Sequence, residues 1–209
     1  MKDSIRRYVQ ETYPDQYACL VAGKLVGDWE NAANHCIIQP VAIEYLMYSM
    51  GFDPTITRQL AKAATCHDWD KRLQKRPSDF TTAEIFCAQQ AFALAEVNPG
   101  LMAATTPLFL VRFQQGNATL LEMIQFLVDD MTMGEEIVHF DLRIDEVSVR
   151  NPHPNDEIEK QLGRPYWTVE REVCNAIDCM LRSILGSKGI IGISVNTLIN
   201  DKIAERFPE

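Results

Sequence analysis

The chain has 209 residues and a formal net charge of −9. A chain of this length is expected to fold as one domain that buries a sizeable core. The excess of acidic residues argues against general binding to nucleic acids or to anionic membranes, because both need a basic surface on the protein. We therefore expect no nucleic acid and no membrane as partners.

Hydrophobic residues recur at helical spacing through most of the chain, which predicts an all-α fold. The expected helices cover about residues 2–12, 16–27, 30–50, 54–67, 81–96, 99–114, 117–132, 139–150, 169–184 and 196–207. Pro40 either kinks the third helix or starts a new one. Residues 69–80 are expected to form a polar loop, residues 134–136 a turn and residues 151–156 a linker.

Two further features bear on the location of the protein. The N-terminal residues are charged and lack the apolar stretch of a signal peptide, and the longest strongly apolar run, residues 101–111, is too short to span a bilayer. The six cysteines form no CxxC pair, so we interpret them as small, buried, reduced core residues. These features predict a cytoplasmic protein.

The densest chemistry lies in residues 65–72, which read Thr-Cys-His-Asp-Trp-Asp-Lys-Arg. Leu60 and Ala64 fall at helical spacing from His67, which places this histidine on the core face at the end of a helix. Asp68 then lies about 100° further round the helix. Taken alone, a His-Asp pair more often marks a hydrogen-bonded core histidine than a metal ligand.

Other residues with metal-binding side chains shift the balance towards a metal site. His35 lies in the first turns of the helix at 30–50, and Asp129 and Asp130 lie near the end of the helix at 117–132. Two histidines and two aspartates from three helices can surround one divalent cation, because neutral imidazoles donate nitrogen and carboxylates balance the charge of the ion. Periodicity alone does not decide between Asp129 and Asp130.

The order H…HD…D resembles the motif of the HD superfamily of metal-dependent phosphohydrolases. His35, His67 and Asp68 match its first three positions, and residues 128–132 look like the stretch that holds the last aspartate. That match selects Asp129 as the fourth ligand. The resemblance implies an HD-domain-like helical bundle in which these four residues bind the metal.

The resemblance also suggests residues for catalysis. Many family members read HDIGK where this chain reads HDWDK at residues 67–71, so Asp70 replaces a glycine. Lys71 matches the family's lysine and is expected to contact phosphate in the transition state, with Arg72 as an alternate substrate-binding residue. Asp70 or Asp130 would orient the attacking water as general base.

The similarity extends over residues 21–150 and includes Arg143 at the position of a frequent arginine. We therefore divide the chain into an N-terminal helix at 1–20, the HD-like metal-binding domain at 21–150 and C-terminal helices at 151–209. The amphipathic helix in the last part is expected to pack on the domain. Its apolar face is the alternative contact for a homodimer.

The number and kind of metal follow from the ligands. No histidine lies between His67 and His139, whereas family members with two metals usually carry extra histidine ligands in that interval. The resemblance therefore implies a single-metal site. Fe²⁺, Mn²⁺, Co²⁺, Ni²⁺ and Zn²⁺ suit the mixed nitrogen and oxygen ligands, and Mg²⁺ suits them less because it prefers all-oxygen coordination.

The predicted activity is hydrolysis of a phosphate ester by metal-activated water, with a nucleotide or related phosphomonoester as the substrate. Trp69 beside the site is interpreted as a core residue rather than a platform for stacking a base. The alternative function is a catalytically silent HD-like domain that binds a small ligand or a protein partner. A chance match to the motif would instead leave His35, His67 and Asp129 far apart in the fold.

Overall fold

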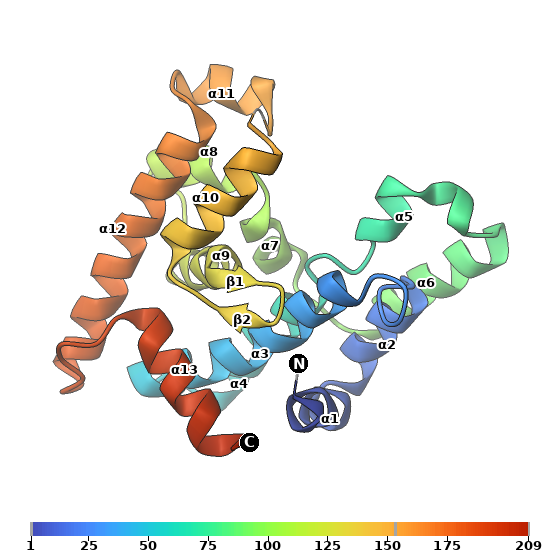
Figure 1. Cartoon of the computed structure of the whole chain (residues 1–209), viewed down its shortest axis with the longest axis horizontal. Helices are drawn as coiled ribbons and strands as arrows, with labels where there is room; N and C mark the ends of the chain where they lie inside the picture. The colour runs from blue at the N-terminus through green and yellow to red at the C-terminus, as the bar shows by residue number, and fades with distance from the viewer. Residues whose placement is uncertain (1, 153, 209) are drawn as a thin grey trace.

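The computed structural model describes residues 2–152 and 154–208, and it confirms the all-α fold class (Figure 1). In chain order the α-helices are α1 (Asp3–Thr12), α2 (Pro14–Ala22), α3 (Glu30–Met50), α4 (Pro54–Cys66), α5 (Lys71–Lys75), α6 (Thr82–Leu94), α7 (Pro99–Met102), α8 (Leu108–Gln114), α9 (Leu120–Met131), α10 (Phe140–Arg150), α11 (Asp156–Leu162), α12 (Tyr166–Ser187) and α13 (Val195–Arg206). Short 3₁₀ turns lie at η1 (Pro77–Asp79) and η2 (Ala103–Thr105), and a hairpin joins β1 (Thr132–Met133) to β2 (Glu136–Ile137).

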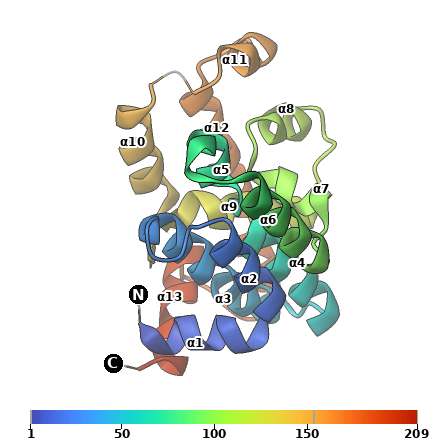
Figure 2. The ribbon, with the colours of Figure 1, turned by 90° about the vertical axis from the view of Figure 1, so that its right-hand side faces the viewer.

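Helix α3 lies at the centre of the molecule and packs against α1, α4, α9 and α13 (Figure 2). It is a single helix that passes through Pro40, so no new helix starts there. A proline inside a helix costs about 3 kcal/mol, because it removes one backbone hydrogen bond and crowds the preceding turn. Most side chains of α3 are buried, and this burial offsets the cost.

One hydrophobic core extends from Ile5 to Phe207 and includes residues from all three predicted segments. The two ends of the described chain meet, because the Lys2 ammonium donates a hydrogen bond of 2.7 Å to the Phe207 carbonyl. Helix α12 packs against α9 and α10, and its inward-facing residues Val169 and Ile177 are buried. The division into segments and the homodimer remain predictions.

The second helix ends earlier than its pattern predicts, at Ala22 instead of residue 27. Gly23 follows, and the chain of α2 passes close to the segment after α4 at this point. A Cβ on Gly23 would lie 2.0 Å from the carbonyl oxygen of Trp69, which is far inside van der Waals contact. The absence of a side chain at Gly23 therefore allows the backbone after His67 and Asp68 to pack directly on α2.

Two other segments differ from their predicted structure. The helix expected at 99–114 is broken into α7, η2 and α8, because Thr106 adopts an extended conformation before Pro107. The loop expected at 69–80 contains α5 and η1. Helix α5 is short and polar, so its sequence lacks the apolar periodicity that would reveal a helix.

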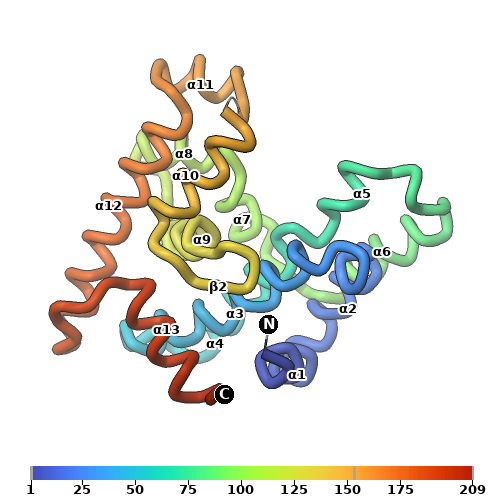
Figure 3. The backbone as a smooth tube through the Cα atoms, viewed as in Figure 1, coloured from blue at the N-terminus to red at the C-terminus, as the bar shows by residue number. Residues whose placement is uncertain are grey.

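The turn expected at 134–136 closes the two-stranded hairpin, in which Thr132 pairs with Ile137 and Met133 with Glu136. Gly134 has a φ of +62°, a left-handed conformation that glycine adopts without strain. Figure 3 traces the chain from α9 through this hairpin and back along α10. The hairpin therefore sets where α10 lies relative to the end of α9.

No helix in the described part of the chain is both long enough and apolar enough to cross a membrane. All six cysteines are free, as expected for reduced thiols. Their burial was predicted correctly for Cys19, Cys36, Cys66 and Cys174 and wrongly for two others. Cys87 and Cys179 are exposed because they lie on the solvent faces of α6 and α12.

Candidate metal centre

His35, His67 and Asp129 come together from three helices. The Nε2 atom of His35 lies 2.8 Å from Asp129 Oδ1 and 3.2 Å from His67 Nε2. The third edge, from His67 Nε2 to Asp129 Oδ1, is 3.2 Å. The three residues therefore lie close together, and the wide separation expected for a chance match to the motif is not found. We call these three residues the His-His-Asp cluster.

The spacing of these atoms fits a bound metal ion. Two atoms bound about 2.1 Å from one ion lie about 3.0 Å apart in adjacent octahedral positions and about 3.4 Å apart in a tetrahedron. The three separations in the cluster, 2.8 to 3.2 Å, lie close to the octahedral value. Three protein ligands would leave positions open for water and substrate. The cluster is therefore able to hold one metal ion.

The orientation of His67 suits metal binding. His67 is the residue that ends α4, and its Nδ1 lies 2.7 Å from the Ala64 carbonyl oxygen. A carbonyl only accepts, so Nδ1 carries the proton that is donated. The lone pair of a neutral imidazole is then on Nε2, the atom that faces the cluster.

The metal-free cluster has an uneven charge distribution. Burial is the strongest influence on His35 and lowers its pKa, so His35 is neutral. Burial also disfavours the charged form of His67, but attraction from Asp129 and Asp68 outweighs it and raises the pKa of His67 to about 9. Partial burial of the Asp129 carboxyl disfavours its charge, yet the two histidines hold its pKa well below its ordinary value. Without a metal, the centre therefore contains an imidazolium beside a carboxylate.

This protonation predicts the pH dependence of metal binding. A metal displaces the proton of His67, so affinity should rise about tenfold per pH unit from pH 6.5 to 8.5 and level off near pH 9. Binding at pH 7.5 should release about one proton, because His35 and Asp129 have already lost theirs. Calorimetric titration in buffers of different ionisation enthalpy measures that proton. Affinity that does not change over this pH range would contradict the assigned protonation of His67.

Gln39 supports the cluster and was not found from the sequence. Its side chain is fully buried, and Nε2 lies 2.8 Å from Asp129 Oδ1 and 3.0 Å from His35 Nε2. Gln125 in turn donates a hydrogen bond of 3.4 Å to Gln39 Oε1. Gln39 is one helical turn after His35 on the same face of α3, a spacing that could have identified it.

Asp68 lies beside the cluster instead of within it. Its Oδ2 is 3.7 Å from His67 Nε2 and is paired with the Lys71 ammonium. Burial disfavours the charged forms of both side chains. Attraction to His67 and to Lys71 nevertheless lowers the pKa of Asp68, and attraction to Asp68 raises the pKa of Lys71. Asp68 therefore holds Lys71 next to the cluster, and its role as a metal ligand remains a prediction.

The structure separates the two neighbouring aspartates. Asp129 belongs to the cluster, whereas Asp130 points towards α12 and accepts a hydrogen bond of 3.1 Å from the Cys174 thiol. Burial and the charge of Asp129 raise the pKa of Asp130 to about 7. Glu170, which like Cys174 is on α12, also interacts with Asp130, and burial raises the pKa of the Glu170 carboxyl well above the ordinary value. The alternative that periodicity left open is thus resolved in favour of Asp129 as the cluster residue.

Two other predicted site residues have partners outside the cluster. Asp70 accepts a hydrogen bond of 3.0 Å from Gln74, and within the described residues it makes no hydrogen bond to the cluster. The guanidinium of Arg72 pairs with Asp79 at 2.9 Å and with Asp28 at 2.8 Å. Arg72 therefore fixes the short helix α5, and a phosphate contact would require it to leave these partners.

Trp69 is a core residue, as interpreted from the sequence. Only 7% of it is exposed, and its ring stacks on Phe92 with the centroids 4.8 Å apart. It is therefore unavailable as a platform for a nucleotide base. Its contact with α6 and the close approach of its carbonyl to α2 fix the backbone that follows His67.

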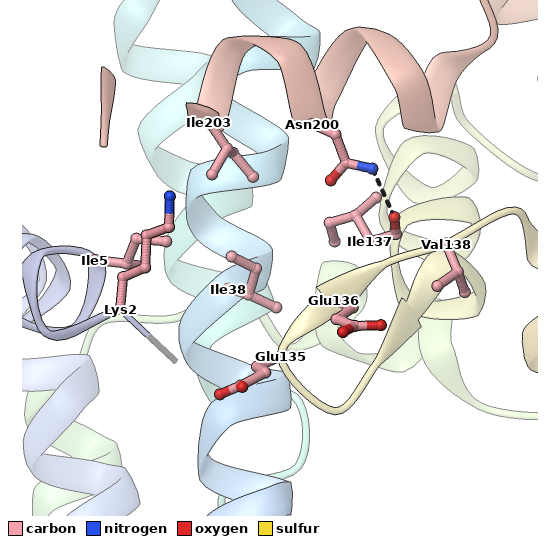
Figure 4. A pocket seen from close by; sticks show the side chains of 9 residues that line it. All are labelled: Lys2, Ile5, Ile38, Glu135, Glu136, Ile137, Val138, Asn200 and Ile203. Atoms are coloured by element: carbon pink, nitrogen blue, oxygen red, sulfur yellow. Dashed lines mark hydrogen bonds between the residues drawn. The ribbon is translucent and has the colours of Figure 1, made fainter. Parts of the chain in front are cut away.

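A cleft of about 380 Å³ opens beside the cluster and is lined by His35, Lys71 and Arg143, among others. A larger cleft of about 660 Å³ lies on the other side of the hairpin, between α1, α3 and α13 (Figure 4). None of the cluster residues lines this larger cleft. One of its polar groups, the Asn200 amide, already donates to the Ile137 carbonyl at 2.8 Å. The smaller cleft is therefore the candidate substrate site.

Comparison of the chain with protein-family models, with curated protein sequences and with solved structures finds no match. The assignment of function therefore depends on the residues of the site. Their geometry identifies a candidate metal centre of two histidines and one aspartate, next to a cleft with cationic residues.

Proposed function

We propose that the protein is a metal-dependent phosphohydrolase with an HD-domain-like helical bundle, and that it cleaves a phosphate ester of a nucleotide or related phosphomonoester. The observation that supports this proposal most strongly is the His-His-Asp cluster next to a cleft that His35 and Lys71 both line. Metal-binding residues beside a cation are the groups needed to bind a phosphate and stabilise its charge during hydrolysis.

Each residue of the cluster has a defined part in this proposal. His35, His67 and Asp129 would hold one divalent transition metal, and Asp68 would complete the ligand set by a small movement of its carboxylate beside Lys71. A bound divalent ion lowers the pKa of water and neutralises phosphate oxygens. Fe²⁺, Mn²⁺, Co²⁺, Ni²⁺ and Zn²⁺ all suit these ligands, and Mg²⁺ suits them less.

The remaining residues would position the substrate. Lys71 lines the cleft with its charge maintained by Asp68, so its ammonium is placed to contact the phosphate as negative charge develops. Gln39 holds the carboxylate of Asp129 in position by its hydrogen bond of 2.8 Å.

A catalytically silent domain that binds a small ligand or a protein partner is the second candidate. It is favoured by the partners of Asp70 and Asp130, which are Gln74 and Cys174 and not the cluster. No general base is therefore assigned among the described residues that contact the cluster. A water-activating role for Asp70 or Asp130 would require a change of partner.

The test is phosphate release from nucleoside mono-, di- and triphosphates and generic phosphomonoesters. Metal-stripped protein would be supplied singly with Mn²⁺, Fe²⁺, Co²⁺, Ni²⁺, Zn²⁺ or Mg²⁺. Asp68→Ala should abolish release, and Asp201→Ala, at an exposed position of α13, should retain it. Release in the wild type that depends on metal and is lost in Asp68→Ala supports the hydrolase. Tight metal binding without turnover of any compound favours the ligand-binding domain.

A further inference from the structure

One wall of the cleft beside the cluster is a face of α10. Arg143, Glu146 and Arg150 all line the cleft, and their spacings of three and four residues place them on one side of the helix. The backbone positions of Arg143 and Arg150 are about 10 Å apart along the helix axis, at a rise of about 1.5 Å per residue. We call these three side chains the α10 wall. It faces the same cleft as His35 and Lys71.

The α10 wall has an excess of positive charge. Arg143 Nη1 lies 2.9 Å from Glu146 Oε2, and Arg150 Nε lies 2.7 Å from Glu146 Oε1. Arg150 Nη2 also donates to Glu146 Oε2 at 2.8 Å, so the two guanidinium groups share one carboxylate. The outer N–H donors of Arg150 are accessible, because 63% of its side chain is exposed. Such a cationic wall is notable in a chain with a net charge of −9. A concave, locally cationic surface attracts anions even on an acidic protein.

One phosphate at the cluster does not account for these cations. A phosphate at the His-His-Asp cluster would meet Lys71, which is paired with Asp68 beside His67. The two guanidinium groups of the α10 wall are instead paired with Glu146, so they form a group of cations separate from Lys71 and its partner Asp68. Guanidinium groups bind phosphate oxygens through two parallel N–H donors. Glu146 occupies the Nε and Nη2 edge of Arg150, and the outer edge formed by Nη1 and Nη2 provides such a pair of donors for a second phosphate group.

We propose that Arg150, with Arg143, forms a second phosphate site on α10, and that the substrate therefore carries two phosphate groups. The inference rests on the proposed function, because it places the scissile phosphate at the cluster. Glu146 holds the two guanidinium groups side by side in the free protein. The second phosphate binds the N–H donors of the two guanidinium groups that do not pair with Glu146. It belongs to either a diphosphate chain or a phosphate on another carbon of the same molecule.

The experiment measures binding separately from turnover. Full-length protein stripped of metal would be titrated calorimetrically with a nucleoside 5′-monophosphate, the 5′-diphosphate and the 3′,5′-bisphosphate. The variants are Arg150→Gln and, as a matched control, Arg182→Gln. Arg182 is also a half-exposed helical arginine paired with an acid, Asp178 at 3.5 Å, but it lies on α12 and outside the cleft.

One of the two-phosphate ligands should bind the wild type and Arg182→Gln about 10- to 100-fold more tightly than the monophosphate does, as hydrogen bonds to a charged group predict. Arg150→Gln should reduce this ratio to near one. The ligand with the higher ratio identifies the source of the second phosphate. Equal binding of all three ligands, or a ratio that persists in Arg150→Gln, overturns the inference.

Hydrolysis of the same three compounds by metal-loaded wild-type protein distinguishes the inference from the proposed function. A high binding ratio without phosphate release supports the second phosphate site and contradicts the hydrolase. Phosphate release with a binding ratio near one supports the hydrolase and overturns the second phosphate site.

Discussion

Asp129→Asn should weaken metal binding by more than about 100-fold. Even residues that only support a metal ligand cost about 10- to 100-fold in affinity when they are replaced, and Asp129 provides a cluster atom itself. The amide has nearly the same shape as the carboxylate, but it lacks the charge that balances a divalent cation. The measurement is titration of metal-stripped protein with Mn²⁺ or Zn²⁺, using a competing chelator where binding is tight.

The neighbouring residue provides the matched control. Asp130→Asn changes the same side chain one position later, where the carboxyl accepts a hydrogen bond from Cys174 on α12. Burial raises the pKa of Asp130 to about 7, so near neutral pH the substitution removes only part of a charge. We expect metal affinity to remain within about threefold of the wild type, a difference below about 1 kcal/mol. The reverse result, in which Asp130→Asn alone loses the metal, would show that the cluster is wrongly assigned.

The sequence predicted which residues meet at the centre better than it predicted how they are arranged. His35 and His67 lie on apolar helical stripes, and a residue on such a stripe must face the core, so their convergence follows from periodicity. Asp129 and Asp130 lie at the edge of one apolar stripe, about 100° apart on the helix, so periodicity allows either of them to face the centre. The resemblance to the family motif selected Asp129, and in the structure the position of α12, which takes Asp130 as its partner, separates the two residues. That information is tertiary.

Gln39 and α5 show what the sequence did not reveal. Gln39 is a polar residue in an apolar helix, and its importance depends on where Asp129 arrives from α9. Helix α5 has five residues, too few to be stable on their own propensity. It is held by the ion pairs of Arg72 with Asp79, seven residues later, and with Asp28, 44 residues earlier in the chain. Tertiary contacts of this kind are invisible to periodicity.

The break at residues 103–107 had a visible signal. Pro107 restricts the residue before it to extended conformations, and Thr106 adopts one, with φ −88° and ψ 153°. The apolar run on both sides suggested one continuous helix and outweighed that signal. In contrast, Pro40 lies inside a continuous helix, because the chain on both sides of it is buried against four other helices. Local backbone preference decides the structure at Pro107, and packing decides it at Pro40.

Lys71→Met should lower kcat for phosphate release by about 10²- to 10³-fold while the metal still binds. The ammonium lines the cleft beside His35 and is held there by Asp68. Removing one group that stabilises charge in a transition state typically costs a factor of this size. Methionine retains much of the length of the side chain, so the loss would report the charge and not the packing. Steady-state kinetics on the best substrate of the panel measures kcat, and calorimetry measures metal affinity.

Lys62→Met is the control for replacing one lysine by methionine at a position outside the cleft. Lys62 is on α4, and its ammonium lies 3.8 Å from Glu96, away from the cleft beside the cluster. We expect this variant to keep the kcat and the metal affinity of the wild type. If Lys71→Met also keeps its kcat, the charge that stabilises the phosphate must come from elsewhere in the cleft, and Arg143 is the next residue to replace. If Lys71→Met loses the metal as well, the Lys71–Asp68 pair is needed to build the metal site, and its effect on kcat does not measure a contact with phosphate.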